Sequence, residues 1–450
     1  MKHIITFGFL FASIISCFLL VFTNRSESNQ LRQYVELAQK YEKEELYIKA
    51  IENYENAISL TENNYEYKLA VIQDYEKLGD TDSAIDLAET VVSTDPEKID
   101  CYYMLLDYYQ KNEEYASYIP FLKMAYQNFP EDEKVKEYVD AVDRLYQVDS
   151  SYYSDITMFF HDRAITCSPF LDDENREKKR YAVIEGDGSV ISSDNIFEDM
   201  KFTDQKDNYL VVDAQKGLQI INSEGYPIAG NSEVVSGAGI QVQFEGCASV
   251  EEDGKQYLLN SELKKSKDSW DFAGTFSNGI APVRVGDKWG IITMDHISSD
   301  SSLCKYEDIK VDEFGRCLNN DRMFVKSSGK YYLMNAEQEK VVETSFEDAD
   351  IFVSEQPAAV KINGKWGFVS IDGEMVIQPE YEDALSFSNG YAAIKKDGKW
   401  GLINRSNKVV VEPGYEQMKY MSTKGLMPVK DESGYWNLLT MYKLYYSEEE

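Results

Sequence analysis

The chain is poor in the residues from which most catalytic sites are built. It has only three histidines among 450 residues, His3, His161 and His296. So few histidines exclude a multi-histidine metal site and disfavour a Ser-His-Asp triad. The sequence also lacks the motifs G-x-S-x-G, G-x-x-x-x-G-K-[ST] and H-E-x-x-H. We therefore predict no catalytic, cofactor-binding or metal-binding residues, and a protein that is not an enzyme.

Patterned cysteines and positive charge are scarce as well. The six cysteines show neither the spacing of a metal site nor the density of a disulfide framework. The chain has 79 Asp and Glu against 46 Lys and Arg, a formal net charge of −33. Such an acidic surface repels phosphates, so we predict no nucleic-acid partner and expect basic partners to be favoured. The many acids leave one chemistry open, a carboxylate pair for glycoside hydrolysis.

An apolar run stands at the start of the chain. Residues 4–23 carry no charge and follow Lys2. About 20 apolar residues can span a bilayer, so we predict a transmembrane helix within a membrane anchor at residues 1–25. Lys2 favours a cytoplasmic N-terminus, which predicts a single-pass protein of a bacterial cell membrane with most of the chain extracytoplasmic. A lipoprotein attached through Cys17 and a cleaved signal peptide are the alternatives.

From residue 31 the apolar pattern has a helical period and recurs every 34 residues. Small residues where helices cross, and a proline after the second helix, suit stacked helix pairs. Corresponding positions hold Tyr41, Tyr75 and Tyr109, then Ala50 and Ala84, then Pro96 and Pro130. The pattern resembles the tetratricopeptide (TPR) repeat, although Tyr34, Lys68 and Tyr102 replace its first Trp. The resemblance implies a TPR α-solenoid over residues 31–147.

The tetratricopeptide resemblance also implies a concave groove along the first helix of each pair. Transferred to this chain, the groove positions are Arg32, Val35, Gln39, Glu42, Leu69, Gln73, Glu76, Tyr103, Asp107 and Gln110. One arginine among acids and amides disfavours capture of a free carboxylate. We therefore predict a protein or peptide partner that is basic or neutral. The alternative is a groove that binds nothing and serves as a spacer or a dimer interface.

A polar stretch at residues 148–178 predicts a linker, and strand signals follow over residues 179–445. The clearest units, 358–369 and 392–403, each place an Asn-Gly or Asp-Gly turn between two short strands. A Trp-Gly pair recurs in these units. The repeated structural residues are Trp289, Gly290, Trp366, Gly367, Trp400, Gly401 and Trp436.

These Trp-Gly units resemble the WG repeat of bacterial proteins. Degenerate copies put Tyr181, Leu218, Gln256, Tyr331 and Trp436 at the Trp position, and successive positions lie 33 to 42 residues apart. An aromatic-acid pair such as Tyr381-Glu382 trails the Trp position in five units. A tryptophan recurring beside a glycine is the expected packing residue, which we favour over a ligand-stacking role.

The fold class predicted is therefore multidomain, α then all-β. The terminal β units look incomplete, as in a ring closed by its own ends, so we favour a β-propeller of seven or eight blades. An open β-solenoid is the alternative. For function we predict a membrane-anchored extracytoplasmic scaffold that binds proteins through its TPR and WG repeats. The alternative is a carbohydrate-binding or hydrolytic cell-envelope protein.

Overall fold

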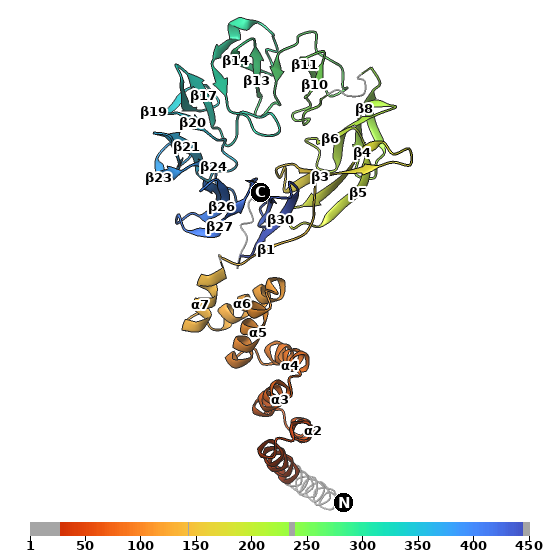
Figure 1. Cartoon of the computed structure of the whole chain (residues 1–450), viewed down its shortest axis with the longest axis vertical. Coiled ribbons are helices and arrows are strands. Elements are labelled where there is room, and N and C mark those ends of the chain that lie inside the picture. The colour runs from red at the N-terminus through yellow and green to blue at the C-terminus, as the bar shows by residue number, and fades with distance from the viewer. Residues whose placement is uncertain (1–27, 143, 234–238, 444–450) are drawn as a thin grey trace, which may run out of the picture. The chain divides into compact units, whose positions relative to one another are not determined.

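The chain divides into two compact units. The computed structural model describes residues 28–142, 144–233 and 239–443. A helical unit ends at Val142, and a unit made of strands begins at Asp143. Each unit is described by itself below, and both can be followed in Figure 1.

The helical unit repeats with a fixed period. A helix over residues 28–43 is followed by α2 (Tyr47–Ile58), α3 (Tyr65–Leu78), α4 (Thr81–Thr94), α5 (Ile99–Lys111), α6 (Tyr115–Asn128) and α7 (Glu133–Val142). Helices α3, α5 and α7 begin 34 residues apart, and so do α2, α4 and α6. Small side chains let adjacent helices approach closely. The fully buried alanines are Ala38, Ala50, Ala57, Ala84, Ala88 and Ala125. The 34-residue period read from the sequence is thus the period of the helices.

The membrane prediction has to be corrected. In the part of the chain that the structure describes, no helix is both long and apolar enough to cross a bilayer. Helices α2 to α7 have 10 to 14 residues, whereas a span needs about 20. The prediction of a single-pass membrane protein is therefore not supported. The predicted anchor at residues 1–25, with Cys17, lies outside the described residues.

The second unit is a ring of antiparallel sheets, which we number as blades 1 to 8 in chain order (Figure 1). Blade 1 contains β2 (Asp155–Ile156), β3 (Arg163–Leu171), β4 (Glu177–Glu185) and β5 (Val190–Ile196). Blade 2 contains β6 (Asp199–Phe202), β7 (Asn208–Asp213), β8 (Gly217–Asn222) and β9 (Pro227–Asn231). Blade 3 contains β10 (Ala248–Glu252) and β11 (Lys255–Leu259). Blade 4 contains β12 (Phe272–Ala273), β13 (Ile280–Val285), β14 (Lys288–Thr293) and β15 (Cys304–Tyr306), with the short helix η1 (Ser301–Leu303) before β15.

The remaining blades follow the same plan. Blade 5 contains β16 (Asp308–Ile309), β17 (Met323–Ser327), β18 (Lys330–Met334) and β19 (Lys340–Phe346). Blade 6 contains β20 (Asp348–Ala349), β21 (Ala358–Ile362), β22 (Lys365–Val369) and β23 (Met375–Tyr381). Blade 7 contains β24 (Asp383–Ala384), β25 (Tyr391–Lys396), β26 (Lys399–Asn404) and β27 (Val409–Tyr415). Blade 8 contains β28 (Gln417–Met418), β29 (Leu426–Lys430) and β30 (Trp436–Met441).

Seven of these sheets have four strands, and blade 3 has two, counted over the described residues. Isolated bridges widen blade 3 on both sides, between Ile240 and Val250 and between Gln256 and Trp270. Blade 8 obtains its fourth strand from far away in the sequence. That strand is β1 (Tyr146–Val148), which pairs with β30.

Strand β1 closes the ring, so the second unit is a β-propeller and the open β-solenoid alternative is wrong. The closing strand comes from residues 146–148, where the sequence predicted the end of the helical repeats. Residues 148–178, expected to be a linker, contain β2, β3 and the start of β4. The first unit therefore has its own opening strands, and the split unit is blade 8 alone.

Closure through β1 generates a test. A chain that begins at residue 151 should have a propeller with a lower unfolding temperature than a chain that begins at residue 144. The shorter chain leaves β30 as an open edge and removes the Asp149 carboxylate that accepts from the Leu438 amide (3.0 Å). Thermal unfolding followed by circular dichroism measures the difference. Equal unfolding temperatures would contradict the closing role of β1.

Candidate functional site

The repeated tryptophan belongs to a row of side chains that crosses each blade from strand to strand. In blade 7 the row runs Asp383, Lys395, Trp400 and Tyr415, each residue facing the next. Blades 4, 5, 6 and 8 have the same cation and aromatic in the middle. These pairs are Arg284 with Trp289, Lys326 with Tyr331, Lys361 with Trp366, and Lys430 with Trp436. We call the Lys or Arg of each pair the row cation.

The row places the aromatic rings in packed surroundings. Trp366 and Trp436 are 8% and 5% exposed, while Trp289 and Trp400 are half-buried. Row cations lie over the rings, with Lys395 Nζ 5.9 Å from the Trp400 ring and Lys430 Nζ 5.5 Å from the Trp436 ring. The indoles of Trp366 and Trp436 therefore pack within and between blades, while those of Trp289 and Trp400 keep part of their surface exposed.

Glycine follows the tryptophan because the neighbouring backbone leaves no room for a side chain. A Cβ on Gly367 would lie 2.5 Å from the Ile377 carbonyl oxygen, and one on Gly401 would lie 2.6 Å from that of Val411. In both blades the pairing with the fourth strand is irregular at this point. The Trp-Gly pair is thus a packing and backbone requirement.

The trailing aromatic-acid pair also has a structural role. The amides of Gly329, Gly364 and Gly398 donate to Glu307, Glu347 and Glu382 at 2.8, 2.8 and 3.0 Å. Each glycine lies in the hairpin turn that follows the acid, so the carboxylate caps that turn. The hydrogen bond from the Gly364 amide lowers the pKa of Glu347 below its usual value. These acids are therefore already engaged within the blade.

The ten predicted groove positions of the helical unit all keep some exposed surface. Arg32, Gln39, Gln73, Glu76 and Asp107 are exposed, and the others are half-buried. Two of the acids already have cationic neighbours. Lys77 Nζ lies 3.7 Å from a Glu42 carboxylate oxygen, and Lys134 Nζ lies 3.1 Å from one of Asp107. The negative potential of this face is therefore weaker than composition alone suggests.

At one face of the propeller, hydrogen bonds join every blade to the next. Most of them involve the loop between the first and second strands of a blade. Blades 1 to 5 are joined by hydrogen bonds from Arg163 to Asp207, from the Gly246 amide to Asp204, from the Gly279 amide to Glu245, and from Ser277 to the Leu318 carbonyl. Blades 5 to 8, and blade 8 to blade 1, are joined by hydrogen bonds from Arg322 to the Ile371 carbonyl, from the Gly390 amide to Gln356, from Asn389 to the Ser422 carbonyl, and from the Thr423 amide to Asp162. This circuit holds the loops in one arrangement.

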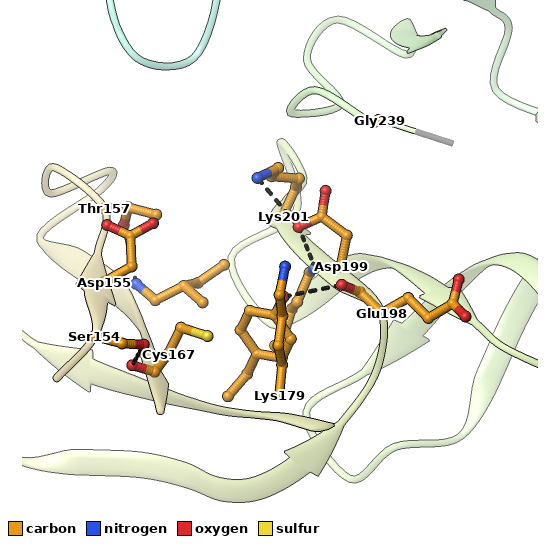
Figure 2. A pocket seen from close by; sticks show the side chains of 12 residues that line it. Ser154, Asp155, Thr157, Cys167, Lys179, Glu198, Asp199, Lys201 and Gly239 are labelled. Carbon is orange, nitrogen blue, oxygen red and sulfur yellow. Dashed lines mark hydrogen bonds and ion pairs between the residues drawn. The ribbon is translucent and has the colours of Figure 1, made fainter. Parts of the chain in front are cut away.

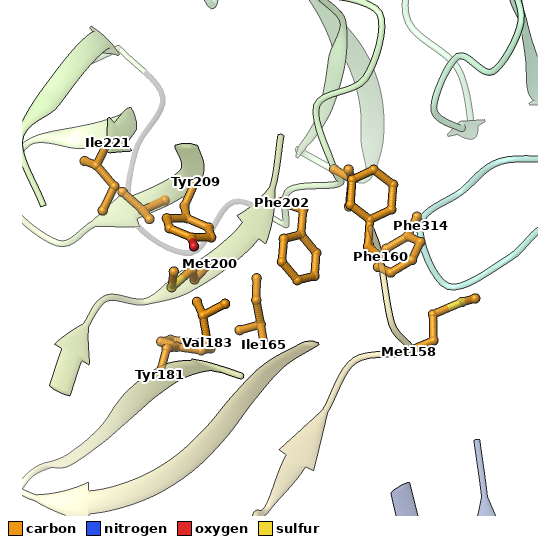
Figure 3. Close-up of a cluster of buried hydrophobic side chains, with 12 residues drawn as sticks. Met158, Phe160, Ile165, Tyr181, Val183, Met200, Phe202, Tyr209, Ile221 and Phe314 are labelled. Atoms are coloured by element: carbon orange, nitrogen blue, oxygen red, sulfur yellow. The ribbon is translucent and has the colours of Figure 1, made fainter. Parts of the chain in front are cut away.

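Aromatic side chains from these loops meet at the ring centre. The rings of Phe160 in blade 1 and Phe314 in blade 5 are 5.0 Å apart, and Phe202 of blade 2 stacks on Phe160 at 5.4 Å (Figure 3). Blades 1 and 5 are opposite in the ring, so this contact crosses the centre. Glu313 of blade 5 also reaches across, since it accepts from the Met158 amide at 2.8 Å and pairs with Lys419 at 3.0 Å. The loops of blades 1 and 5 therefore contact and stabilise one another at the centre of the ring.

A cavity of about 280 Å³, which we call the mouth, opens among these loops. Its lining includes Phe160, His161, Arg316, Ser354, Asn389 and Met421. Arg316 Nε donates to Asp312 at 2.7 Å, and its guanidinium lies 5.4 Å from the Phe160 ring. Loss of hydration, with the charge of Arg316, lowers the pKa of His161 below its ordinary value. The mouth thus combines an immobilised cation, a neutral imidazole and apolar surface.

The half-buried acid Asp350 lies on the loop after β20. The Tyr420 hydroxyl donates to Asp350 at 2.8 Å, and the Ser386 amide donates to it at 2.7 Å. Burial raises the pKa of Asp350 above its usual value. Because Tyr420 belongs to blade 8 and Asp350 to blade 6, this pair adds a polar brace to the aromatic contacts.

A second cavity, of about 490 Å³, lies between blades 1 and 2, and we call it the interblade cleft. Asp155, Cys167, Tyr181, Glu198 and Asp199 line it, together with Lys179 and Lys201 (Figure 2). Lys201 Nζ pairs with Asp199 at 3.2 Å. Burial raises the pKa of the Cys167 thiol, which keeps it neutral. The sequence placed Tyr181 at the Trp position of a degenerate unit but predicted no binding role for any of these residues. The signal that could have found them is the missing Lys or Arg opposite Tyr181.

The closed ring of antiparallel sheets defines the class of protein, a β-propeller. The family model described as "WG containing repeat" matches residues 270–289, 333–366, 366–400 and 400–436. WG repeats are therefore present in the C-terminal region, as the Trp-Gly spacing predicted. The helical region has no family match, so the tetratricopeptide resemblance stays a prediction.

The solved structures that the chain resembles are propellers at low similarity. The β-propeller domain of Cps50 (Swd1) from Myceliophteria thermophila is 10% identical, with 65% of this chain and 98% of that chain covered and a TM-score of 0.34. The Dos1 propeller is 8% identical, covers 66% and 94%, and has a TM-score of 0.40. Sqt1 from Chaetomium thermophilum, bound to the N-terminus of the ribosomal protein L10, is 9% identical, covers 66% and 100%, and has a TM-score of 0.38. TM-scores this low do not establish a shared fold. The assignment of the propeller therefore rests on the strand order given above. A search of curated proteins finds no match.

The packing of the row generates a prediction for Trp366. Replacing it with alanine should lower the free energy of unfolding by about 3–5 kcal/mol, because a large buried side chain leaves a cavity. Replacing the half-buried Trp400 with alanine should lower the free energy of unfolding by less. Lys396→Ala is the control, because Lys396 is exposed. Equilibrium denaturation of the full chain measures these differences. A Trp366→Ala variant as stable as the Lys396→Ala variant would contradict the packing role.

Proposed function

We propose that this chain is a non-enzymatic scaffold that binds protein partners, and that the mouth of the propeller is its main binding face. The observation that carries the proposal is the circuit of hydrogen bonds around the ring. Loops held in one arrangement before binding lose little conformational freedom when a partner docks, so less of the interaction free energy is offset. The same loops are braced through the ring centre by Phe160, Phe314 and Glu313.

The lining of the mouth suits a peptide segment. Phe160 and Met421 provide apolar surface, while Ser354 and Asn389 offer hydroxyl and amide groups. Protein interfaces combine such a hydrophobic centre with a few polar contacts. A cavity of about 280 Å³ has room for one or two side chains of a partner.

The helical unit supplies a second candidate face. Its 34-residue period, its buried alanines and its helix pairs support the proposal of a tetratricopeptide-like array. Exposed Gln39, Gln73 and Asp107 occupy corresponding positions in successive repeats. A basic or neutral peptide is the occupant that this face favours.

The carbohydrate-binding or hydrolytic alternative depended on exposed tryptophans and a free acid pair. The repeated indoles are packed in the rows, and Glu307, Glu347 and Glu382 cap turns. These observations favour the scaffold over that alternative.

Crosslinking at the mouth tests the main proposal. A photoreactive amino acid at position 161 should form crosslinks to a partner protein in cells, because His161 is exposed at the rim. Ser354→Phe should abolish these crosslinks by filling the mouth. Ser406→Phe is the matched control, since Ser406 is exposed in an outer hairpin turn of blade 7. Crosslinks that persist unchanged in Ser354→Phe would refute the assignment of the mouth.

Salt dependence tests the helical face. A lysine-rich peptide with both ends blocked should bind this face more weakly as ionic strength rises, because screening weakens attraction between exposed charges. Glu76→Gln should weaken binding and reduce the salt dependence. Glu52→Gln, on α2 and outside the predicted groove, should do neither. Tight capture of an acidic C-terminal peptide, or affinity indifferent to salt, would show that the groove assignment is wrong.

A further inference from the structure

The interblade cleft lies where the row of blade 1 departs from the common pattern. Five blades have a Lys or Arg facing the aromatic of the third strand. In blade 1 the row runs Asp155, Cys167, Tyr181 and Asn195, so a cysteine stands in place of the row cation. In blade 2 the position opposite Asp199 is Val212. Both blades that border the cleft therefore lack the cation.

The missing side chain leaves both space and uncompensated charge. In blades 5, 6 and 7 the row cation faces an acid of the first strand, and these acids, Asp308, Asp348 and Asp383, are half-buried. Asp155 is exposed instead. Its carboxylate accepts from the Ile156 amide at 2.9 Å, and within the described residues it pairs with no cation.

The walls of the cleft contain an aromatic side chain and an acid, the same two groups that face the row cation in blade 7. Tyr181 lines the cleft at the row position that Trp400 holds beside Lys395 in blade 7. Asp155 stands on the far strand, as Asp383 does. The difference is that the cleft is open, with a volume of about 490 Å³.

The lining of the cleft contains more acids than lysines. Asp155, Glu198 and Asp199 outnumber Lys179 and Lys201. Lys201 pairs with Asp199, whereas Lys179 is an exposed side chain on β4 whose ammonium points into the cleft (Figure 2). An incoming cation would therefore meet Asp155 and compete with Lys179.

We propose that the interblade cleft binds a lysine or arginine side chain of a partner protein, which takes the place of the row cation that blade 1 lacks. The incoming side chain enters the open cleft beside Tyr181, and its charged end pairs with Asp155. This proposal extends the proposed binding role to a second site, away from the mouth.

The probe is an acetylated and amidated pentapeptide, Gly-Ser-Lys-Ser-Gly, titrated against the full chain and followed by ligand-observed NMR. The same peptide with norleucine in place of lysine is the uncharged comparison.

Asp155→Asn should weaken lysine-peptide binding by about tenfold, since an ion pair is lost. Asp383→Asn is the matched control, because Lys395 already faces that acid, and it should leave binding unchanged. Lys179→Gln should strengthen binding by removing the competing ammonium.

Cys167→Lys is the decisive variant, because it supplies the row cation from the chain itself. It should abolish lysine-peptide binding while the unfolding temperature stays equal to wild type or rises. Equal binding of the lysine and norleucine peptides, unchanged binding in Cys167→Lys, or no binding by wild type at about 10 mM peptide would overturn the proposal. Crosslinking at position 161 reports separately on the mouth. Crosslinks retained without peptide binding would therefore reject the cleft and leave the proposed function standing.

Discussion

The row of cation and aromatic side chains is the interaction on which the propeller depends. It joins three or four strands of a blade in register, because a slip of one residue would turn each side chain of the row to the opposite face. The glycine after the tryptophan lets the fourth strand approach at an irregular pairing, and the acid beyond it caps the next hairpin. One short sequence pattern thus specifies the register, the strand spacing and the turn.

Because this pattern is short and local, the parts of the fold that it specifies could be predicted from the sequence. The Trp-Gly spacing located the third strand even in degenerate copies, since Tyr181, Leu218 and Gln256 lie in β4, β8 and β11. The 34-residue helical period could be predicted for the same reason, because it depends on residues close together in the sequence. The closing strand β1 was missed because three residues, Tyr146 to Val148, carry no pattern of their own and pair only with a strand at the far end of the chain. The polar tip of the β3–β4 hairpin was interpreted as a linker for the same reason.

The two cavities differ in how they relate to the repeat. The mouth is built by loops that vary from blade to blade, and Phe314 reaches Phe160 only after the ring is complete. No periodicity could have indicated that contact. The interblade cleft, by contrast, is a local exception to the repeated row, visible as Cys167 where Lys or Arg stands elsewhere. In this ring the departure from the repeat, and not the repeat itself, creates the cleft.

The closing strand has a consequence for how the chain folds. The hydrogen bond from the Leu438 amide to Asp149 joins residues 289 positions apart. Contacts between such distant residues form late, because a long loop must be closed before they contribute any stability. During synthesis, blades 1 to 7 can form while β1 still waits for β30. For that interval β1 and β29 lack their shared partner β30, and their open edges can pair with other chains. Aggregation during biosynthesis is therefore most probable just before the last few residues of β30 emerge.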